Sequence, residues 1–258
     1  MLKAEHPLWG YRRVWAYMRY RQGQQVNKKR VYRLMKEHNL LVTRQYKNKA
    51  KRTFSRPKPR ADRPNQVWGT DMTKINIGSW GWMYLVIIID WHTKEIIGHC
   101  LSMQSKTDQW LEALHEAVDK RFPHGIRDTM EEPLHLVSDN GCQPSSQRYI
   151  KECGVLGINQ IFTSWSNPRG NADTERVLRT LKEDLVWCHD WDNPFDFQEA
   201  LKGWIDRYNR DFPHQTLNYM TPEQFYQKNV ERDTRGLSES PERVALITSE
   251  PASILFPS

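Results

Sequence analysis

The sequence predicts an α/β protein in which a mixed sheet with crossover helices follows a small helical module. Three observations support this fold class. Residues 64–230 alternate short apolar strand patterns with longer amphipathic helix patterns, residues 1–42 show two short helix patterns and no strand, and a basic linker without apolar periodicity fills residues 43–63. The sequence from Ser238 onward is rich in Ser, Pro and Glu, so we expect residues 231–258 to form a disordered tail.

The first 42 residues predict two helices joined by a tight turn. The first helix has apolar residues at the spacing i, i+3, i+4 and i+7, which are Tyr11, Val14, Trp15 and Met18. Gly23 breaks this pattern, and Asn27 is a good N-cap for the second helix. In that helix we expect three apolar residues to face inward, namely Val31, Leu34 and Met35. The arrangement predicts a helix-turn-helix-like module.

Positive charge is concentrated at the N-terminal end of the chain. Residues 1–63 carry 19 Lys and Arg against 3 Asp and Glu, whereas the remaining residues carry 19 against 28. This asymmetry favours a DNA-binding module and a linker that lies along phosphates. The predicted DNA contacts in the module are Arg12, Arg13, Lys28, Lys29, Arg30 and Arg33. The alternatives are a solvated basic face, a membrane-surface patch, a helical hairpin that only packs on the body, and a linker extended by its own charge.

The cysteines and the hydropathy pattern indicate a soluble protein of the cytoplasm. The four cysteines show no CxxC spacing, which is typical of free thiols in a reducing compartment and argues against a structural zinc site. The longest apolar run, Leu85 to Ile89, is too short to span a membrane, and no signal peptide is visible. We therefore expect a cytoplasmic, nucleoid-associated protein without a membrane partner.

The predicted body begins with three strands. Gln66 to Thr73, Met83 to Asp90 and Ile96 to Leu101 are joined by short turns, which predicts an antiparallel meander. The elements expected after the meander are a helix at 107–121, a strand at 134–138, a helix at 146–153, a strand at 159–163 and a long helix at 172–188. The order β-β-β-α-β-α-β-α is that of the ribonuclease H-like fold.

Three carboxylates occupy positions that predict a metal site. Asp71 lies in the first strand, Asp139 follows the fourth strand in a Ser-Asp-Asn-Gly turn, and Glu175 opens the long helix. Together they could form an oxygen cage for a pair of Mg²⁺ ions, which phosphoryl-transfer enzymes use on nucleic acid. Each acid also has a structural alternative. Asp71 could pair with a lysine across the sheet, Asp139 could form the turn, and Glu175 could complement the helix dipole.

The motifs around these acids resemble a known family. Trp68-Gly69-Thr70-Asp71-Met72-Thr73, Ser138-Asp139-Asn140-Gly141 and the helix with Glu175 and Leu181-Lys182 resemble the retroviral-integrase-type catalytic core. The N-terminal helix pair and the segment from Tyr208-Asn209 to Thr221-Pro222 resemble the OrfB transposases of bacterial insertion sequences, in the insertion-sequence-three group. The sequence departs from the family pattern at Cys142-Gln143-Pro144 and at Asp173-Thr174, which puts the contacts of the DNA loop in doubt.

The resemblance implies a DDE transposase or integrase that cleaves DNA and transfers strands. It implies that Asp71, Asp139 and Glu175 hold two Mg²⁺ ions, with Mn²⁺ as a substitute. It also implies that Lys182 contacts DNA phosphate, and Arg179 is a further predicted DNA contact because it lies on the same helix face. The implied partners are double-stranded DNA, further copies of the chain in a synaptic complex, and a subunit or fusion from an upstream reading frame. The rival hypotheses are a non-catalytic DNA-binding regulator or partial copy, and a ribonuclease H-type nuclease.

Overall fold

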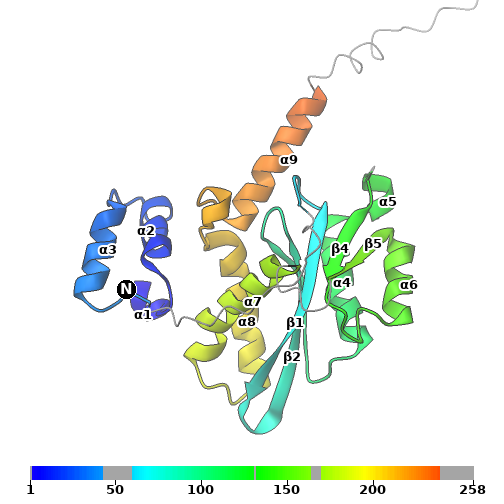
Figure 1. Cartoon of the computed structure of the whole chain (residues 1–258), viewed down its shortest axis with the longest axis horizontal. Helices are drawn as coiled ribbons and strands as arrows, with labels where there is room; N and C mark the ends of the chain where they lie inside the picture. Colours follow the sequence, from blue (N-terminus) through cyan, green and yellow to red (C-terminus); the bar gives the residue numbers. More distant parts are fainter. Residues whose placement is uncertain (1, 43–59, 131, 164–169, 239–258) are drawn as a thin grey trace, which may run out of the picture.

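The computed structural model describes residues 2–42, 60–130, 132–163 and 170–238, and it places one mixed sheet at the centre of the molecule (Figure 1). The strands are β1 (Val67–Ile77), β2 (Gly81–Asp90), β3 (Ile96–Ser102), β4 (Leu134–Ser138) and β5 (Ile158–Phe162). Their order across the sheet is β3-β2-β1-β4-β5, with β1–β2 and β2–β3 antiparallel and β1–β4 and β4–β5 parallel. The predicted meander and the ribonuclease H-like order of elements are thus present.

The helices flank this sheet and extend the chain at both ends. They are α1 (Leu2–Glu5), α2 (Tyr11–Tyr20), α3 (Lys28–Glu37), α4 (Thr107–Arg121), α5 (Ile126–Thr129), α6 (Gln147–Leu156), α7 (Ala172–Asp184), α8 (Pro194–Asp211) and α9 (Pro222–Ser238), with short 3₁₀ turns η1 (Gly78–Trp80), η2 (Val186–Cys188) and η3 (Gln215–Leu217). None of the helices in the described ranges is both long and apolar enough to cross a membrane.

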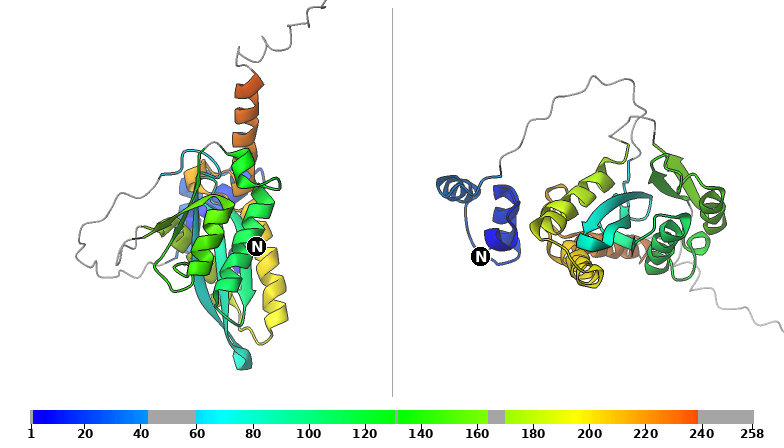
Figure 2. Two further views of the ribbon diagram at one scale, coloured as in Figure 1. Left: turned by 90° about the vertical axis from the view of Figure 1, so that its right-hand side faces the viewer. Right: turned by 90° about the horizontal axis from the view of Figure 1, so that it is seen from below.

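The two faces of the sheet bury two separate cores, because successive residues of a strand point to opposite faces. In β2, Leu85, Ile87 and Ile89 pack with residues of α7 and α8, whereas Val86 and Ile88 pack with residues of α4 and α6. Figure 2 shows the same separation, with α7 and α8 on one side of the sheet and α4 and α6 on the other. A near-continuous apolar run such as that of β2 is typical of a strand buried on both faces.

Several element ends differ from the sequence prediction. The helix predicted over 172–188 ends at Asp184, and the chain continues as the separate turn η2. Helix α9 runs to Ser238, past the expected boundary at residue 230. Leu34 was expected to face inward but its side chain is 41% exposed, whereas Val31 and Met35 are buried as expected. The apolar stripe on α3 is narrower than predicted because only one side of this helix packs against α2.

The N-terminal helices form a small unit beside α7 and α8 (Figure 2). The side chain of Asn27 accepts a hydrogen bond from the Lys29 amide at 2.8 Å, so Asn27 is the predicted N-cap of α3. Trp15 donates its indole hydrogen to the Val26 carbonyl at 2.8 Å and so ties α2 to the turn that precedes α3. Most of the predicted linker (residues 43–59) and the end of the predicted tail (residues 239–258) lie outside the described residues.

Candidate active site

The register of the sheet brings Asp71 and Asp139 to the same level on neighbouring strands. Strand β1 pairs with β4 in parallel from Val67↔His135 to Gly69↔Val137, and the pairing ends there. Continued by two residues, this register sets Asp71 opposite Asp139. The β1–β4 pairing ends at Gly69, so the two carboxylates stand where β4 ends beside the continuing strand β1. Binding sites of open α/β sheets commonly lie at such places.

Helix α7 carries Glu175 to the same place because its first turn packs directly on β1. The Asn171 side-chain amide donates a hydrogen bond to the Thr70 carbonyl at 2.9 Å, and this contact is buried. Trp91 donates its indole hydrogen to the Thr174 hydroxyl at 3.2 Å, also in a buried position. Gly69 makes this approach possible, because a Cβ atom there would overlap the Trp91 ring and the Thr174 hydroxyl.

The electrostatics of Asp71 show that these acids act on one another. The pKa of Asp71 is raised to about 6, mainly by burial and also by the charges of Asp139 and Glu175. Two interactions work in the opposite direction, namely the hydrogen bond from the Met72 amide at 2.7 Å and the positive charge of Lys182. Asp71 is thus a partly buried carboxylate, and its carboxylate neighbours make its negative charge less favourable.

Asp139 and Glu175 lie at the solvent side of this group. Both are exposed, and Asp139 accepts a hydrogen bond from the Gly141 amide at 3.0 Å within its turn. Among the residues that the structure describes, no three His, Cys, Asp or Glu side chains are already drawn together as a metal site. The charges of Asp139 and Glu175 nevertheless act on Asp71, so the three acids share one electrostatic environment.

The two predicted cations of α7 differ in their surroundings. Lys182 follows Glu175 by seven residues, two helical turns, and its charge acts on Asp71. Arg179 forms an exposed ion pair with Glu183 at 2.7 Å, one turn further along the helix. Such exposed pairs contribute little to stability, so the guanidinium can still exchange this partner for a phosphate.

The predicted DNA contacts of the N-terminal helices fall into two groups. Arg12, Lys29, Arg30 and Arg33 are exposed. Arg13 instead lies against the body, where it forms an ion pair with Asp184, and the Lys28 ammonium lies 4.3 Å from the centre of the Trp15 ring. The DNA contact predicted for Arg13 stays a prediction, and the structure shows this side chain 26% exposed and paired with the Asp184 carboxylate.

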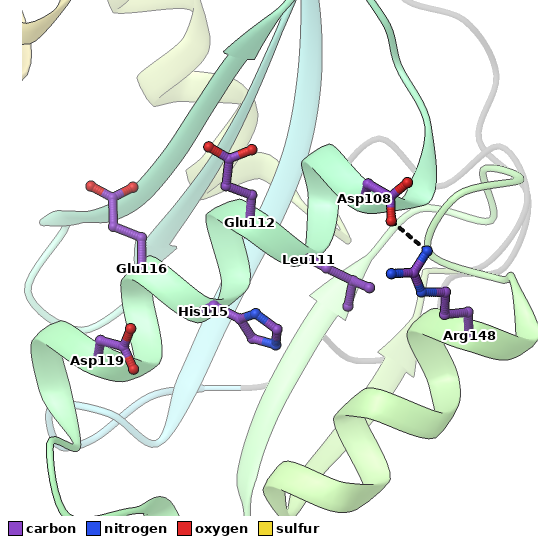
Figure 3. A pocket seen from close by; sticks show the side chains of 7 residues that line it. All are labelled: Asp108, Leu111, Glu112, His115, Glu116, Asp119 and Arg148. Atoms are coloured by element: carbon purple, nitrogen blue, oxygen red, sulfur yellow. Dashed lines mark ion pairs between the residues drawn. The ribbon is translucent and has the colours of Figure 1, made fainter.

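The opposite face of the molecule has a different charge. An open hollow of about 580 Å³ lies between α4 and α6 (Figure 3). Four acidic residues of α4 line it, namely Asp108, Glu112, Glu116 and Asp119. Only Arg148 brings a full positive charge to this lining, and it is paired with Asp108. A surface lined by carboxylates repels phosphate, so this face is unsuited to nucleic acid.

Sequence patterns missed the residues that hold the acids in place. The sequence patterns do not single out Asn171 or Trp91, although both side chains hold α7 on the sheet. Asp184 was not singled out, yet its side chain is 1% exposed and faces the N-terminal helices. A tryptophan in a turn and an acid at a helix end carry no periodic signal, so pattern analysis had little to detect.

Comparison with known proteins agrees with this architecture. The profile of the integrase core domain matches residues 61–168, a second integrase core profile matches residues 156–222, and an HTH-like domain matches residues 1–49. A chain of the simian T-cell lymphotropic virus intasome, solved in complex with PP2A regulatory subunit B56 gamma, superposes with a TM-score of 0.53. It is 17% identical and the match covers 94% of this chain and 78% of that one, a likeness that shows the fold alone. The fold class is a ribonuclease H-like integrase core preceded by an HTH-like module.

Two relatives from Escherichia coli specify the family. The putative transposase InsK of insertion sequence element IS150, from strain K12, is 30% identical over 223 residues, which cover 83% of this chain and 76% of the relative. The transposase InsD of the IS2 element is 25% identical over 244 residues, which cover 92% and 78%. The chain belongs to the OrfB-type transposases of bacterial insertion sequences. Its function is DNA transposition, and it is an enzyme of the polynucleotidyl-transferase type that acts on DNA.

Proposed function

We propose that Asp71, Asp139 and Glu175 are the catalytic acids of this transposase and bind two Mg²⁺ ions, which Mn²⁺ can replace. The observation that carries the proposal is the position of Asp71, a partly buried carboxylate just past the end of the β1–β4 pairing, with two further acids raising its pKa. The donor set fits, because Mg²⁺ prefers carboxylate oxygens and its charge would remove the repulsion. Bound there, the ions would activate the attacking hydroxyl and stabilise the leaving oxygen during cleavage and strand transfer.

The residues of the chain contribute orientation to this reaction. Asn171 and Trp91 hold the first turn of α7 on β1, so that Glu175 faces the opening beside Asp71. Lys182 supplies a positive charge near the acids, which suits a phosphate of the bound DNA. The exposed cations of α3, Lys29, Arg30 and Arg33, are suited to attach the duplex through its phosphates.

The assembly and the domain limits are part of the same proposal. We assign DNA binding to residues 1–42 with the basic linker 43–63, and catalysis to residues 64–230. The active form would be an assembly of several copies on paired element ends, with a subunit or fusion from an upstream frame as a further partner. The structure of similar fold is described as an intasome, which supports an oligomeric assembly as part of this proposal.

A strand-transfer assay with purified protein tests the catalytic assignment. The substrate is a duplex that carries the ends of the encoding insertion sequence, with Mg²⁺ or Mn²⁺, and an RNA–DNA hybrid serves as the comparison. We expect nicking and joining of the duplex, and loss of both in Asp71→Asn and Glu175→Gln with DNA binding retained. Cleavage of the hybrid alone would support the nuclease alternative, and activity in both variants would refute the assignment of the acids.

A further inference from the structure

The N-terminal helices are joined to the catalytic domain by a buried contact around Trp9. This residue precedes α2 and is only 1% exposed. Its ring stacks on His6, with centroids 3.9 Å apart and an interplanar angle of 7°, and meets Phe212 edge-on at 5.0 Å. Phe212 follows α8, so the aromatic contact crosses from the module to the body. A module connected to the body only through the linker would not bury a tryptophan against the body in this way.

A buried carboxylate completes the contact. Asp184, the last residue of α7, accepts a hydrogen bond from the Trp9 indole at 3.3 Å and pairs with Arg13 at 3.7 Å. Its side chain is 1% exposed, and the Arg13 guanidinium also lies 5.2 Å from the centre of the Phe212 ring. The Asp184 carboxylate is buried and the Arg13 side chain is 26% exposed, so loss of Arg13 would leave a buried charge without its partner.

Further contacts prevent rotation about this point. The ring of Tyr20 at the end of α2 stacks on Tyr219 at 5.6 Å, and the Trp15 ring meets the same tyrosine edge-on at 5.3 Å. Arg21 pairs with Asp211 at the end of α8. The module therefore touches the body at two separated places. The exposed cations of α3 take no part in these contacts and remain open to a ligand.

The joint lies on the helix that carries a proposed catalytic acid. Asp184 follows Glu175 by nine residues on α7, a separation of about 14 Å at 1.5 Å per residue. We infer that Trp9, Arg13 and Asp184 form a positioning joint that fixes the DNA bound on α3 at a set distance from the acids, and thereby selects the phosphate that is cut. This inference rests on the proposed function. Without the joint, DNA held by the module could slide relative to the catalytic domain within the reach of the linker.

Two measurements on the full chain test the joint. The first variant is Trp9→Ala, and Asp184→Asn and Arg13→Gln replace it if that protein fails to fold. The matched control is Trp82→Ala, because Trp82 lies near the tip of the β1–β2 hairpin and is 54% exposed. In small-angle X-ray scattering without DNA, we expect the joint variants to gain radius of gyration and the control to keep it. An unchanged radius in every joint variant would overturn the inference.

The second measurement is the map of cut positions on an element-end duplex, taken at equal DNA occupancy. We expect one dominant position for the wild type and the control, and several neighbouring positions for the joint variants. A larger radius combined with a single unchanged cut position would also overturn the inference. If the wild type cuts no duplex, the proposed function fails instead, and the scattering result still decides whether the module is docked.

Discussion

Asp71 and Asp184 are two carboxylates withdrawn from solvent, the first partly and the second almost fully, and they differ in what surrounds them. The pKa of each is raised to about 6, with burial as the largest cause. Around Asp71 the neighbouring acids Asp139 and Glu175 contribute to this rise, whereas around Asp184 the Arg13 charge and the Trp9 hydrogen bond oppose it. Burial alone therefore does not identify a functional carboxylate. The sign of the neighbouring charge separates a proposed metal ligand from a structural ion pair.

The largest expected effect comes from removing the charge of Asp71. Asp71→Asn should lower DNA cleavage by at least about 10³-fold, because metal binding supplies several kcal/mol and each 1.36 kcal/mol is a factor of ten. The same variant should lose any rise of the melting temperature with Mg²⁺, while Asp184→Asn should keep it. Calorimetry with and without Mg²⁺ measures both. If Mg²⁺ changes the melting temperature of the two variants equally, the assignment of Asp71 and not Asp184 as a metal ligand is refuted.

The close packing of α7 on β1 at Gly69 should not tolerate an added methyl group. Gly69→Ala should lower the free energy of unfolding by about 3 kcal/mol or more, because the new Cβ overlaps the Trp91 ring and the Thr174 hydroxyl. Gly154→Ala in α6 is the control. No atom lies within 4 Å of a Cβ at that helical position, so about 0.5–1 kcal/mol of stabilisation is expected. Denaturant titration compares them, and equal stabilities would mean that β1 and α7 separate easily.

Asp184 should leave a signature in the pH dependence of stability. Its pKa is about 6 in the folded chain against 3.8 as the ordinary value, so the folded form takes up a proton first as the pH falls. As the pH falls from about 6 to about 4, the free energy of unfolding of the wild type should therefore rise relative to that of Asp184→Asn, by up to about 3 kcal/mol. Unfolding curves across this range measure it. If the free energy of unfolding of the wild type falls instead, the attraction of Arg13 for the Asp184 carboxylate outweighs the effect of burial on its pKa. The same curves measured with Mg²⁺ should not differ.

The smallest effect concerns the exposed cations of α3. Replacing Lys29 and Arg30 by Gln should weaken DNA binding and reduce the slope of log K against log salt by about 0.9 for each lost phosphate contact. Arg148→Gln is the matched control, since Arg148 is equally a surface cation but lies in the acidic hollow between α4 and α6. Fluorescence titrations over a range of salt concentrations measure the slopes. The same slope for both proteins would count against DNA binding by α3.

The two carboxylates also differ in how far the sequence could predict them. Asp71 lies in an apolar strand, where a carboxylate is conspicuous, and the short apolar runs separated by turns predict the sheet around it. Asp184 lies among other polar residues near a helix end, and its partner Trp9 is 175 residues away. The alternation of strands and helices therefore predicted the core and its acids. The joint depends on side-chain contacts between distant segments, for which the chain offers no local pattern.

The register of the sheet also has a consequence for the order of events during synthesis. Strands β1, β2 and β3 pair through short turns and can form early, but β4 must find β1 across the whole meander and α4 before Asp139 reaches Asp71. The third acid arrives later still, with α7. A nascent transposase on the ribosome therefore cannot assemble its proposed metal site until most of the chain has emerged. On the proposed assignment, fragments that end before α7 lack Glu175 and should not cut DNA.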